Sequence, residues 1–274
     1  MQHFYPLYLA NKAHEGTDEA LEVVNKYNQE TVAEVARADA ELLEQAIEAG
    51  VKAIPAMQAL KPYQKQRILL DCVAKFNERF DEFTEALIAE GGKPEGAAKA
   101  EVKRLIATFQ FAADAVTTMP EGEVIPLDVT EASAGYRGFS KRVPIGLCSF
   151  ISPFNFPLNL VAHKIAPAIA AGCPFILKPA SYTPIGALLI ADVLAETDLP
   201  EGAFSILPMS SKVADKLVTD ERIKLLSFTG SDKVGWDMKA RAGKKKVVLE
   251  LGGNAAVMIE PDADLETALP RVIT

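Results

Sequence analysis

Three polar side chains stand at the ends of short apolar runs and could carry chemistry: Asn155, Lys178 and Glu250. Such runs are typical of strands buried on both faces of a parallel sheet. Ligands of these sheets bind beyond the carboxyl ends of the strands, so we expect Asn155 and Lys178 to face one site. A lysine placed there can meet a ribose or a phosphate. Ordinary alternatives stay open, since Asn155 could be a turn residue, Lys178 a solvated surface lysine and Glu250 a charged residue leaving the sheet.

A glycine-bearing turn offers a second kind of chemistry. Gly230 and Ser231 follow the apolar run 225–228, and Gly235 lies in the helix expected next. Glycine lets backbone and hydroxyl donors approach a diphosphate at the N-terminus of that helix. The alternative is a plain turn before a helix. The usual Gly-x-Gly-x-x-Gly pattern of dinucleotide sites is absent from the sequence.

The second half of the chain alternates strands with helices. We expect strands near 147–152, 174–178, 203–207, 224–228, 246–250 and 255–259, and helices at 157–171, 183–195, 211–218 and 231–241. This alternation predicts an α/β fold, with a Rossmann-like parallel sheet and helices on both of its faces. The segments that carry Asn155 and Lys178 then form a single β-α-β unit.

The first third is predicted to be mainly helical and shows no active-site chemistry. Phe4–Leu9 and Val32–Val35 are expected to be short strands, and Asp39 is expected to cap a helix that ends at Gly50. Further helices are expected near 62–76, 78–88 and 95–116.

Residues 121–143 predict a β-hairpin that projects from the body of the protein. Val124 and Ile125 precede a small-residue turn at 132–135, and residues 136–142 alternate in polarity. An exposed hairpin with such apolar side chains is an aggregation liability unless something covers it.

Five short motifs resemble, in order and spacing, the signatures of the aldehyde dehydrogenase superfamily. They are Glu90-Gly-Gly-Lys-Pro94, Pro153-Phe-Asn-Phe-Pro157, Lys178-Pro179, Phe228-Thr-Gly-Ser231 and Glu250-Leu-Gly-Gly253. Each motif alone is weak, whereas the ordered set is specific. The first usually has threonine at its second position, so Gly91 departs from the family pattern. The resemblance covers about half of a family member, its N-terminal, cofactor-binding part.

The resemblance implies roles for these motifs. It makes Asn155 the donor that stabilises the oxyanion formed when a thiolate attacks an aldehyde. Glu250 becomes the general base that activates water to release the acid from a thioester. The hairpin would grip a neighbouring subunit, which implies a homo-oligomer. The cofactor contacts that the resemblance implies are Ile151, Ser152, Pro153, Phe154, Lys178, Ser181, Phe228, Gly230, Ser231, Leu251 and Gly252.

The implied cofactor is NAD or NADP, and we expect NADP to bind at least as well as NAD. NAD-preferring family members often carry a glutamate three residues after the strand-end lysine, where this chain has Ser181. Serine removes the repulsion of a 2′-phosphate and leaves a hydroxyl that can donate to it. Against this, no arginine stands near in the sequence, and Ser181 could simply begin the turn before Pro184. The loop 208–211 also lacks the family's usual glycines.

No cysteine stands in the setting of a nucleophile. Cys72 lies on the apolar face of a helix, Cys148 within a buried strand and Cys173 in a tight turn, so we interpret all three as structural thiols. The family's cysteine motif would fall shortly past Thr274, and we therefore expect this chain alone to be inactive. The three histidines form no triad and no metal-ligand spacing, so no metal site is predicted.

Composition excludes several classes of function. The net charge of −8, from 29 basic and 37 acidic residues, argues against a nucleic-acid binder or a binder of anionic membranes. We find no signal peptide and no apolar run of the ~20 residues that a membrane span needs. Three scattered cysteines are too few for a disulfide framework or a zinc site, and a reducing cytoplasm is the expected location.

Two hypotheses about function follow. The first is the cofactor-binding part of an aldehyde dehydrogenase, which oxidises a small-molecule aldehyde to a carboxylic acid through a cysteine thioester. The second is a non-catalytic NAD(P)-binding or scaffolding protein derived from the same fold. In either case residues 1–120 and 144–253 are expected to form the NAD(P)-binding domain, 121–143 an oligomerisation hairpin, and 254–274 the start of a truncated catalytic domain.

Overall fold

The computed structural model describes residues 2–17, 19–119 and 121–273. Within these residues seven strands form one sheet in the order β12-β11-β8-β9-β10-β2-β3. The parallel strands are β8 (Cys148–Ile151), β9 (Phe175–Lys178), β10 (Phe204–Ile206), β11 (Leu225–Gly230) and β12 (Lys246–Leu251). β2 (Leu7–Leu9) and β3 (Lys12–His14) extend the sheet in antiparallel fashion. The predicted α/β fold with a parallel sheet is confirmed.

The chain enters the parallel part of the sheet at its centre. It builds β8, β9 and β10 outward in one direction and then returns to add β11 and β12 on the other side of β8. The order therefore reverses between β8 and β11, the position at which open α/β sheets bind ligands. The register places Ile151 beside both Lys178 and Phe228, so the loops after these three strands meet at one edge.

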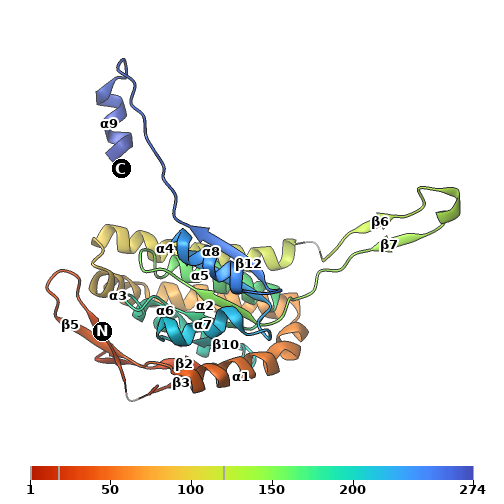
Figure 1. The fold of residues 1–274 in the computed structure, drawn as a ribbon, viewed down its shortest axis with the longest axis horizontal. Coiled ribbons are helices and arrows are strands. Elements are labelled where there is room, and N and C mark those ends of the chain that lie inside the picture. The colour runs from red at the N-terminus through yellow and green to blue at the C-terminus, as the bar shows by residue number, and fades with distance from the viewer. Residues whose placement is uncertain (1, 18, 120, 274) are drawn as a thin grey trace.

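Helices cover both faces of the sheet (Figure 1). Phe150 and Leu177 face one core, whereas Ile176 and Leu226 face the other, as the alternation of side chains along a strand requires. The first face packs against α2 (Pro62–Glu78), α3 (Phe80–Gly91), α4 (Glu95–Thr118), α5 (Asn159–Ala171) and α6 (Ile185–Ala195). The second packs against α1 (Ala40–Ala59), α7 (Ser211–Thr219) and α8 (Asp232–Arg241).

The N-terminal segment forms two strands, where the sequence predicted one. Phe4–Leu9 divides at Pro6, which has no backbone N–H to donate to a ladder. β1 (Phe4–Tyr5) pairs with β5 (Thr31–Val35) in a small sheet that also contains β4 (Leu21–Val24), whereas β2 joins the large sheet. The segment therefore ties the small sheet to the large one.

The helix that follows is longer than predicted. Asp39 caps it as expected, with its carboxylate accepting from the N–H groups of Glu41 and Leu42 at 3.0 and 2.9 Å. The helix does not end at Gly50 but continues as α1 to Ala59. A Cβ atom at Gly50 would lie 2.7 Å from Cδ1 of Leu147. Glycine there permits close packing of the helix on the sheet and is not a stop signal.

The predicted hairpin is present and projects from the body (Figure 1). β6 (Val124–Pro126) pairs with β7 (Arg137–Phe139), and a short 3₁₀ turn at Glu131–Ser133 lies between them. Val124 and Phe139 are 76% and 82% exposed, so the described residues leave its apolar side chains uncovered.

The strand predicted at 255–259 does not form, so that prediction was wrong. Residues 252–260 have no regular structure, and Val257 is exposed. An extended segment needs a neighbouring strand for its hydrogen bonds, and this one leaves the sheet towards α9 (Leu265–Ile273), which lies apart from it (Figure 1). Residues 1, 120 and 274, on which predicted domain boundaries fall, lie outside the described residues. Within the described ranges no helix could cross a membrane.

Candidate functional site

The loop between β8 and α5 presents Asn155 at the carboxyl edge of the sheet. Oδ1 of Asn155 accepts from the backbone N–H of Phe156 at 3.1 Å, so its amide group is the part that can donate to a ligand. The ring of Phe154 stands edge-on to that of Tyr182 in the next loop, with the ring centroids 6.2 Å apart. The first two strand-to-helix loops thus contact each other. The helix begins at Asn159, two residues later than predicted.

Lys178 ends β9 and is buried, which excludes the alternative of a solvated surface lysine. Its Nζ donates to the carbonyl of Pro179 at 3.0 Å. One carbonyl does not saturate an ammonium group with three donors. Burial lowers the pKa of Lys178. Ser181 follows in the exposed turn before α6.

The turn between β11 and α8 is packed too tightly for side chains at its glycines. A Cβ atom at Gly230 would lie 2.4 Å from Cζ of Phe228, and one at Gly235 would lie 2.4 Å from Cδ2 of Leu251. Ser231 is the N-cap residue of α8 but makes no side-chain capping bond. Among the described residues no side chain caps the first-turn N–H groups of α8.

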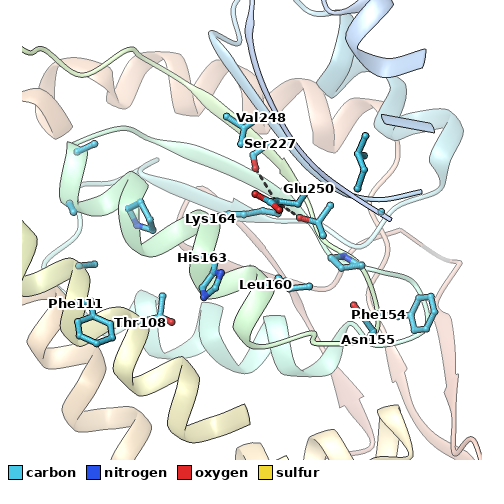
Figure 2. A pocket seen from close by; sticks show the side chains of 18 of the residues that line it. Thr108, Phe111, Phe154, Asn155, Leu160, His163, Lys164, Ser227, Val248 and Glu250 are labelled. Atoms are coloured by element: carbon cyan, nitrogen blue, oxygen red, sulfur yellow. Dashed lines mark hydrogen bonds between the residues drawn. The ribbon is translucent and has the colours of Figure 1, made fainter. Parts of the chain in front are cut away.

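A cavity of about 1300 Å³ opens where these elements meet (Figure 2). β11 and β12 form its floor, because their register pairs Ser227 with Val248 and Thr229 with Glu250 on the face that α5 covers. Of the predicted site residues, the cavity is lined by Pro153, Phe154, Asn155, Gly230, Ser231, Glu250, Leu251 and Gly252. Asn155 and Glu250, far apart in the sequence, therefore share one space.

The other predicted residues do not line this cavity. Ile151 and Phe228 are buried in the core on the opposite face of the sheet. Ser152 is buried as well, and its N–H donates to the carbonyl of Lys178 at 3.2 Å. Lys178 and Ser181 belong to the neighbouring loop at the same edge.

Lys164 is a candidate residue that the sequence did not reveal. It lies on α5 and donates to Oγ of Ser227 at 2.9 Å and to Oγ1 of Thr229 at 2.8 Å, with Glu250 beside it (Figure 2). Burial lowers the pKa of Lys164 to about 8, against the opposing charge of Glu250. The one available signal was a lysine within an otherwise apolar helix face, between Val161 and Ile165.

His163 adds a second basic group to the cavity wall (Figure 2). Partial burial lowers the pKa of His163, and the positive charges of Arg104 and Lys164 lower it further. The guanidinium carbon of Arg104 lies 5.6 Å from the ring centroid of Phe156, the residue after Asn155. Basic side chains therefore gather on the α4–α5 side of the cavity.

The three cysteines lie elsewhere. Cys72, Cys148 and Cys173 are all buried, and none of them lines the cavity. Cys148 begins β8 and Cys173 precedes β9, so both lie at the amino edge of the sheet, opposite the loops described above. Burial raises the pKa of Cys72. Within the described ranges no group of three His, Cys, Asp or Glu side chains could hold a metal ion.

Comparisons of sequence point to one family. Residues 13–274 match the aldehyde dehydrogenase family. The chain is 36% identical over 265 residues to the 3-sulfolactaldehyde dehydrogenase of Priestia megaterium, covering 96% of this chain and 55% of that protein. It is 34% identical over 255 residues to the NADP+ succinate-semialdehyde dehydrogenase of Escherichia coli K12, covering 92% and 52%. The chain spans about half the length of the curated relatives it matches.

Solved structures agree with this result. Aldehyde dehydrogenase 21 of Physcomitrella patens, in complex with the reaction product succinate, superimposes with a TM-score of 0.91 at 51% identity, covering 93% of this chain and 53% of that one. The NADP-dependent glyceraldehyde-3-phosphate dehydrogenase of Bacillus halodurans, complexed with NADP, superimposes with a TM-score of 0.94 at 26% identity, covering 99% and 58%.

Proposed function

This chain belongs to the aldehyde dehydrogenase family, and we propose that it supplies the cofactor site and two catalytic residues for the NAD(P)+-dependent oxidation of an aldehyde to a carboxylic acid. The observation that carries the proposal is the cavity beside the β8–β11 reversal, where Asn155 and Glu250 line one space. Oxidation through a thioester needs an oxyanion donor and a water-activating base around one carbon atom.

The cofactor is proposed to lie along the same edge. Its diphosphate would meet the N-terminus of α8, where Ser231 leaves the first-turn N–H groups open. Lys178 and Ser181 would hold the adenosine ribose, and Ser181 brings no carboxylate that would repel a 2′-phosphate. NADP is therefore proposed to bind at least as well as NAD. When bound, the nicotinamide accepts the hydride that the aldehyde loses.

The residues of this chain act on the aldehyde carbon in two stages. A cysteine thiolate attacks the carbonyl, and the amide of Asn155 donates to the oxygen that becomes negative. After the carbon has lost its hydride, a thioester remains. Glu250 then removes a proton from water, whose oxygen attacks the thioester and releases the acid and the thiol.

The nucleophile is proposed to be a cysteine other than the three described above. Cys148 and Cys173 lie at the wrong edge of the sheet, and Cys72 is enclosed in the core. We therefore expect this 274-residue chain, purified alone, to form no NAD(P)H from aldehydes. Activity that disappears in Cys148→Ala or Cys173→Ala would contradict this assignment.

An aldehyde with a second, negatively charged group is the substrate class we propose. The ammonium group of Lys164 lines the cavity, and Arg104 lies close enough for its positive charge to lower the pKa of the wall residue His163. The similar proteins named above act, by their names, on 3-sulfolactaldehyde, succinate semialdehyde or glyceraldehyde 3-phosphate, or hold succinate, and all of these compounds are anionic. In the full-length protein, kcat/KM should be higher for succinate semialdehyde than for neutral butanal. Arg104→Gln should reduce the ratio of these two kcat/KM values.

The predicted division of the chain is carried forward as a proposal. Residues 1–120 and 144–253 would form the NAD(P)-binding domain, and 254–274 would begin the catalytic domain. The uncovered apolar side chains of the 121–143 hairpin support contact with another subunit in a homo-oligomer. Three free cysteines are consistent with a reducing compartment such as the cytoplasm.

Rapid mixing of the full-length protein with NADP+ and an aldehyde tests the function. We expect a burst of NADPH followed by steady turnover. Glu250→Gln should keep the burst and slow the steady phase by about 100-fold or more, because it removes the base for thioester hydrolysis. A variant that loses the burst but keeps normal turnover would contradict the role of Glu250. Cofactor binding without any burst in the unaltered protein would favour the non-catalytic scaffold.

A further inference from the structure

Two buried carboxylates lie behind the site, outside the cavity. Glu90 lies in the last turn of α3 and Glu101 in the second turn of α4, on either side of the Gly-Gly-Lys-Pro sequence. They are 0% and 1% exposed. A buried carboxylate is retained only where hydrogen bonds or an opposite charge compensate for its lost hydration. The partners of each therefore show what it does.

Glu101 closes the N-terminus of α5. Its Oε1 accepts from the backbone N–H groups of Leu158 at 2.9 Å and Asn159 at 3.1 Å. Leu158, the N-cap residue, has no side chain that could cap the helix itself. The other oxygen of Glu101 forms an ion pair with Lys93, whose side chain is 15% exposed. The start of α5 is thus held by a charge pair from another part of the chain.

Lys93 connects that pair to the loop that carries Asn155. Its Nζ lies 4.0 Å from the ring centroid of Phe156, within the range of a cation–π contact. The N–H of Phe156 donates to Oδ1 of Asn155. Lys93 therefore contacts Glu101 on one side and the neighbour of Asn155 on the other.

Glu90 makes the corresponding contacts at the next helix. Its Oε2 accepts from the N–H of Ile185 at 2.7 Å, and its Oε1 from the N–H of Gly186 at 2.8 Å. These are first-turn donors of α6, whose N-cap residue, Pro184, offers no capping side chain. The turn held in this way contains Ser181 and follows Lys178.

We propose that the Glu101–Lys93 pair positions Asn155 for stabilising the oxyanion, whereas Glu90 positions the Lys178–Ser181 turn for binding the cofactor. Both glutamates are positioning residues, since neither reaches the cavity. The inference rests on the function proposed above. It assigns one task to each carboxylate, so the two should affect different steps when they are changed.

Glutamine replacements in the full-length protein separate the two tasks. In Glu101→Gln an amide NH2 would face the ammonium group of Lys93 and break the pair. In Glu90→Gln an amide NH2 group would face one of the two backbone N–H groups. An NH2 group cannot accept a hydrogen bond, so that N–H would lose its partner. The measurements are the single-turnover rate of NADPH formation at saturating cofactor and the Kd of NADP+ from titration calorimetry.

Glu101→Gln should slow the single-turnover rate by about tenfold or more, since small displacements of a catalytic group lower rates strongly. Its Kd for NADP+ should stay within about twofold of that of the unaltered protein. Glu90→Gln should raise that Kd by about fivefold or more through the lost hydrogen bond, with the single-turnover rate within about threefold. Lys93→Met should resemble Glu101→Gln, and Lys93→Arg should restore most of the rate.

Glu95→Gln is the matched control, because Glu95 lies on the same helix and pairs with Lys99 at the exposed surface. Glu95→Gln should change neither the single-turnover rate nor the Kd of NADP+. If Glu101→Gln does not fold, Lys93→Met tests the same pair. Equal effects of the two buried variants on both quantities, or no effect beyond a lower unfolding temperature, would overturn the assignment. An unaltered protein that binds NADP+ but oxidises no aldehyde would instead overturn the proposed function.

Discussion

The helices that begin at the carboxyl edge of the sheet differ in how their first turns are satisfied. Glu101 and Glu90 occupy the N–H groups at the starts of α5 and α6. At α7 the hydroxyl of Ser210 accepts from the N–H of Val213 at 3.3 Å. At α8 no side chain among the described residues takes these donors. Three starts are closed from within the protein and one is open.

This difference separates positioning from binding. The first turn of a helix offers unpaired N–H groups and the positive end of the helix dipole, which together favour an anion. A protein carboxylate that fills such a turn leaves no donors for a ligand, but it holds the preceding loop in place. On our proposal the closed turns would position Asn155 and Ser181, and the open turn at Ser231 would be left to bind the diphosphate.

The largest expected effect concerns the loop that the closed start of α5 holds. Asn155→Ala in the full-length protein should lower kcat by about 100- to 1000-fold, as the loss of one oxyanion donor does in comparable sites. The Kd of NADP+ should change little. Stopped-flow measurement of NADPH formation tests this, with Asn77→Ala on the exposed side of α2 as the control. An unchanged rate would reduce Asn155 to a turn residue and break the comparison.

A smaller effect concerns the charge of the carboxylate at α6. Burial raises the pKa of Glu90 to about 8, and the hydrogen bonds from Gly186 and Ile185 and the charge of Lys26 oppose the rise. Between the usual carboxyl pKa and about 8, the folded protein then keeps a proton that the unfolded chain has lost. Its stability should fall as pH rises through that window, by about 1 kcal/mol per pH unit.

Thermal unfolding of the unaltered protein and of Glu90→Gln from pH 5 to pH 8 measures this effect. The glutamine has no proton to lose, so the unaltered protein should lose stability relative to the variant as pH rises. Parallel curves would mean that Glu90 is already ionised when folded. The glutamates at the starts of α5 and α6 would then both be charged, and the two helix starts would no longer differ in the charge that closes them.

The smallest effect concerns cofactor choice in the turn that Glu90 holds. Ser181→Glu should weaken NADP+ binding by about tenfold relative to NAD+, because a carboxylate repels the 2′-phosphate. Titration of both cofactors, followed by heat or by the fluorescence of Trp236, decides this. A clear NAD preference in the unaltered protein that persists in Ser181→Glu would mean that residue 181 does not contact the ribose.

Local hydrophobic patterns predicted the parallel sheet, because strand-like and helix-like segments alternate along the sequence. Apolar runs such as 174–178 are buried on both faces, as their composition indicates. The pattern failed at 255–259, where a run suited to a strand has no neighbouring strand to pair with. It also misplaced the end of α1, because Gly50 serves a contact with Leu147, which no local pattern reveals.

The site could be predicted only as far as its motifs reach. Asn155 and Glu250 lie in recognisable motifs and share a cavity, whereas Lys178, which was expected to face the same site as Asn155, does not line it. Lys164 was missed because its partners, Ser227 and Thr229, lie 63 and 65 residues away. Glu101 was missed for the same reason, since it holds a helix whose N-cap residue lies 57 residues later. The role of a buried polar residue follows from its partners, which are distant in the sequence and can be identified only in the folded structure.

The open start of α8 is the central claim, and Ser231→Asp tests it most directly. Aspartate is a favoured N-cap residue, so the change should close the turn and leave the protein equally or more stable. Its charge should repel the diphosphate by about 3 kcal/mol at an effective dielectric constant of about 20, or about 100-fold in the Kd of NADP+. Ser210→Asp, at the capped start of α7, should change the Kd by less than about twofold. Unchanged NADP+ binding in a folded Ser231→Asp protein would contradict the account.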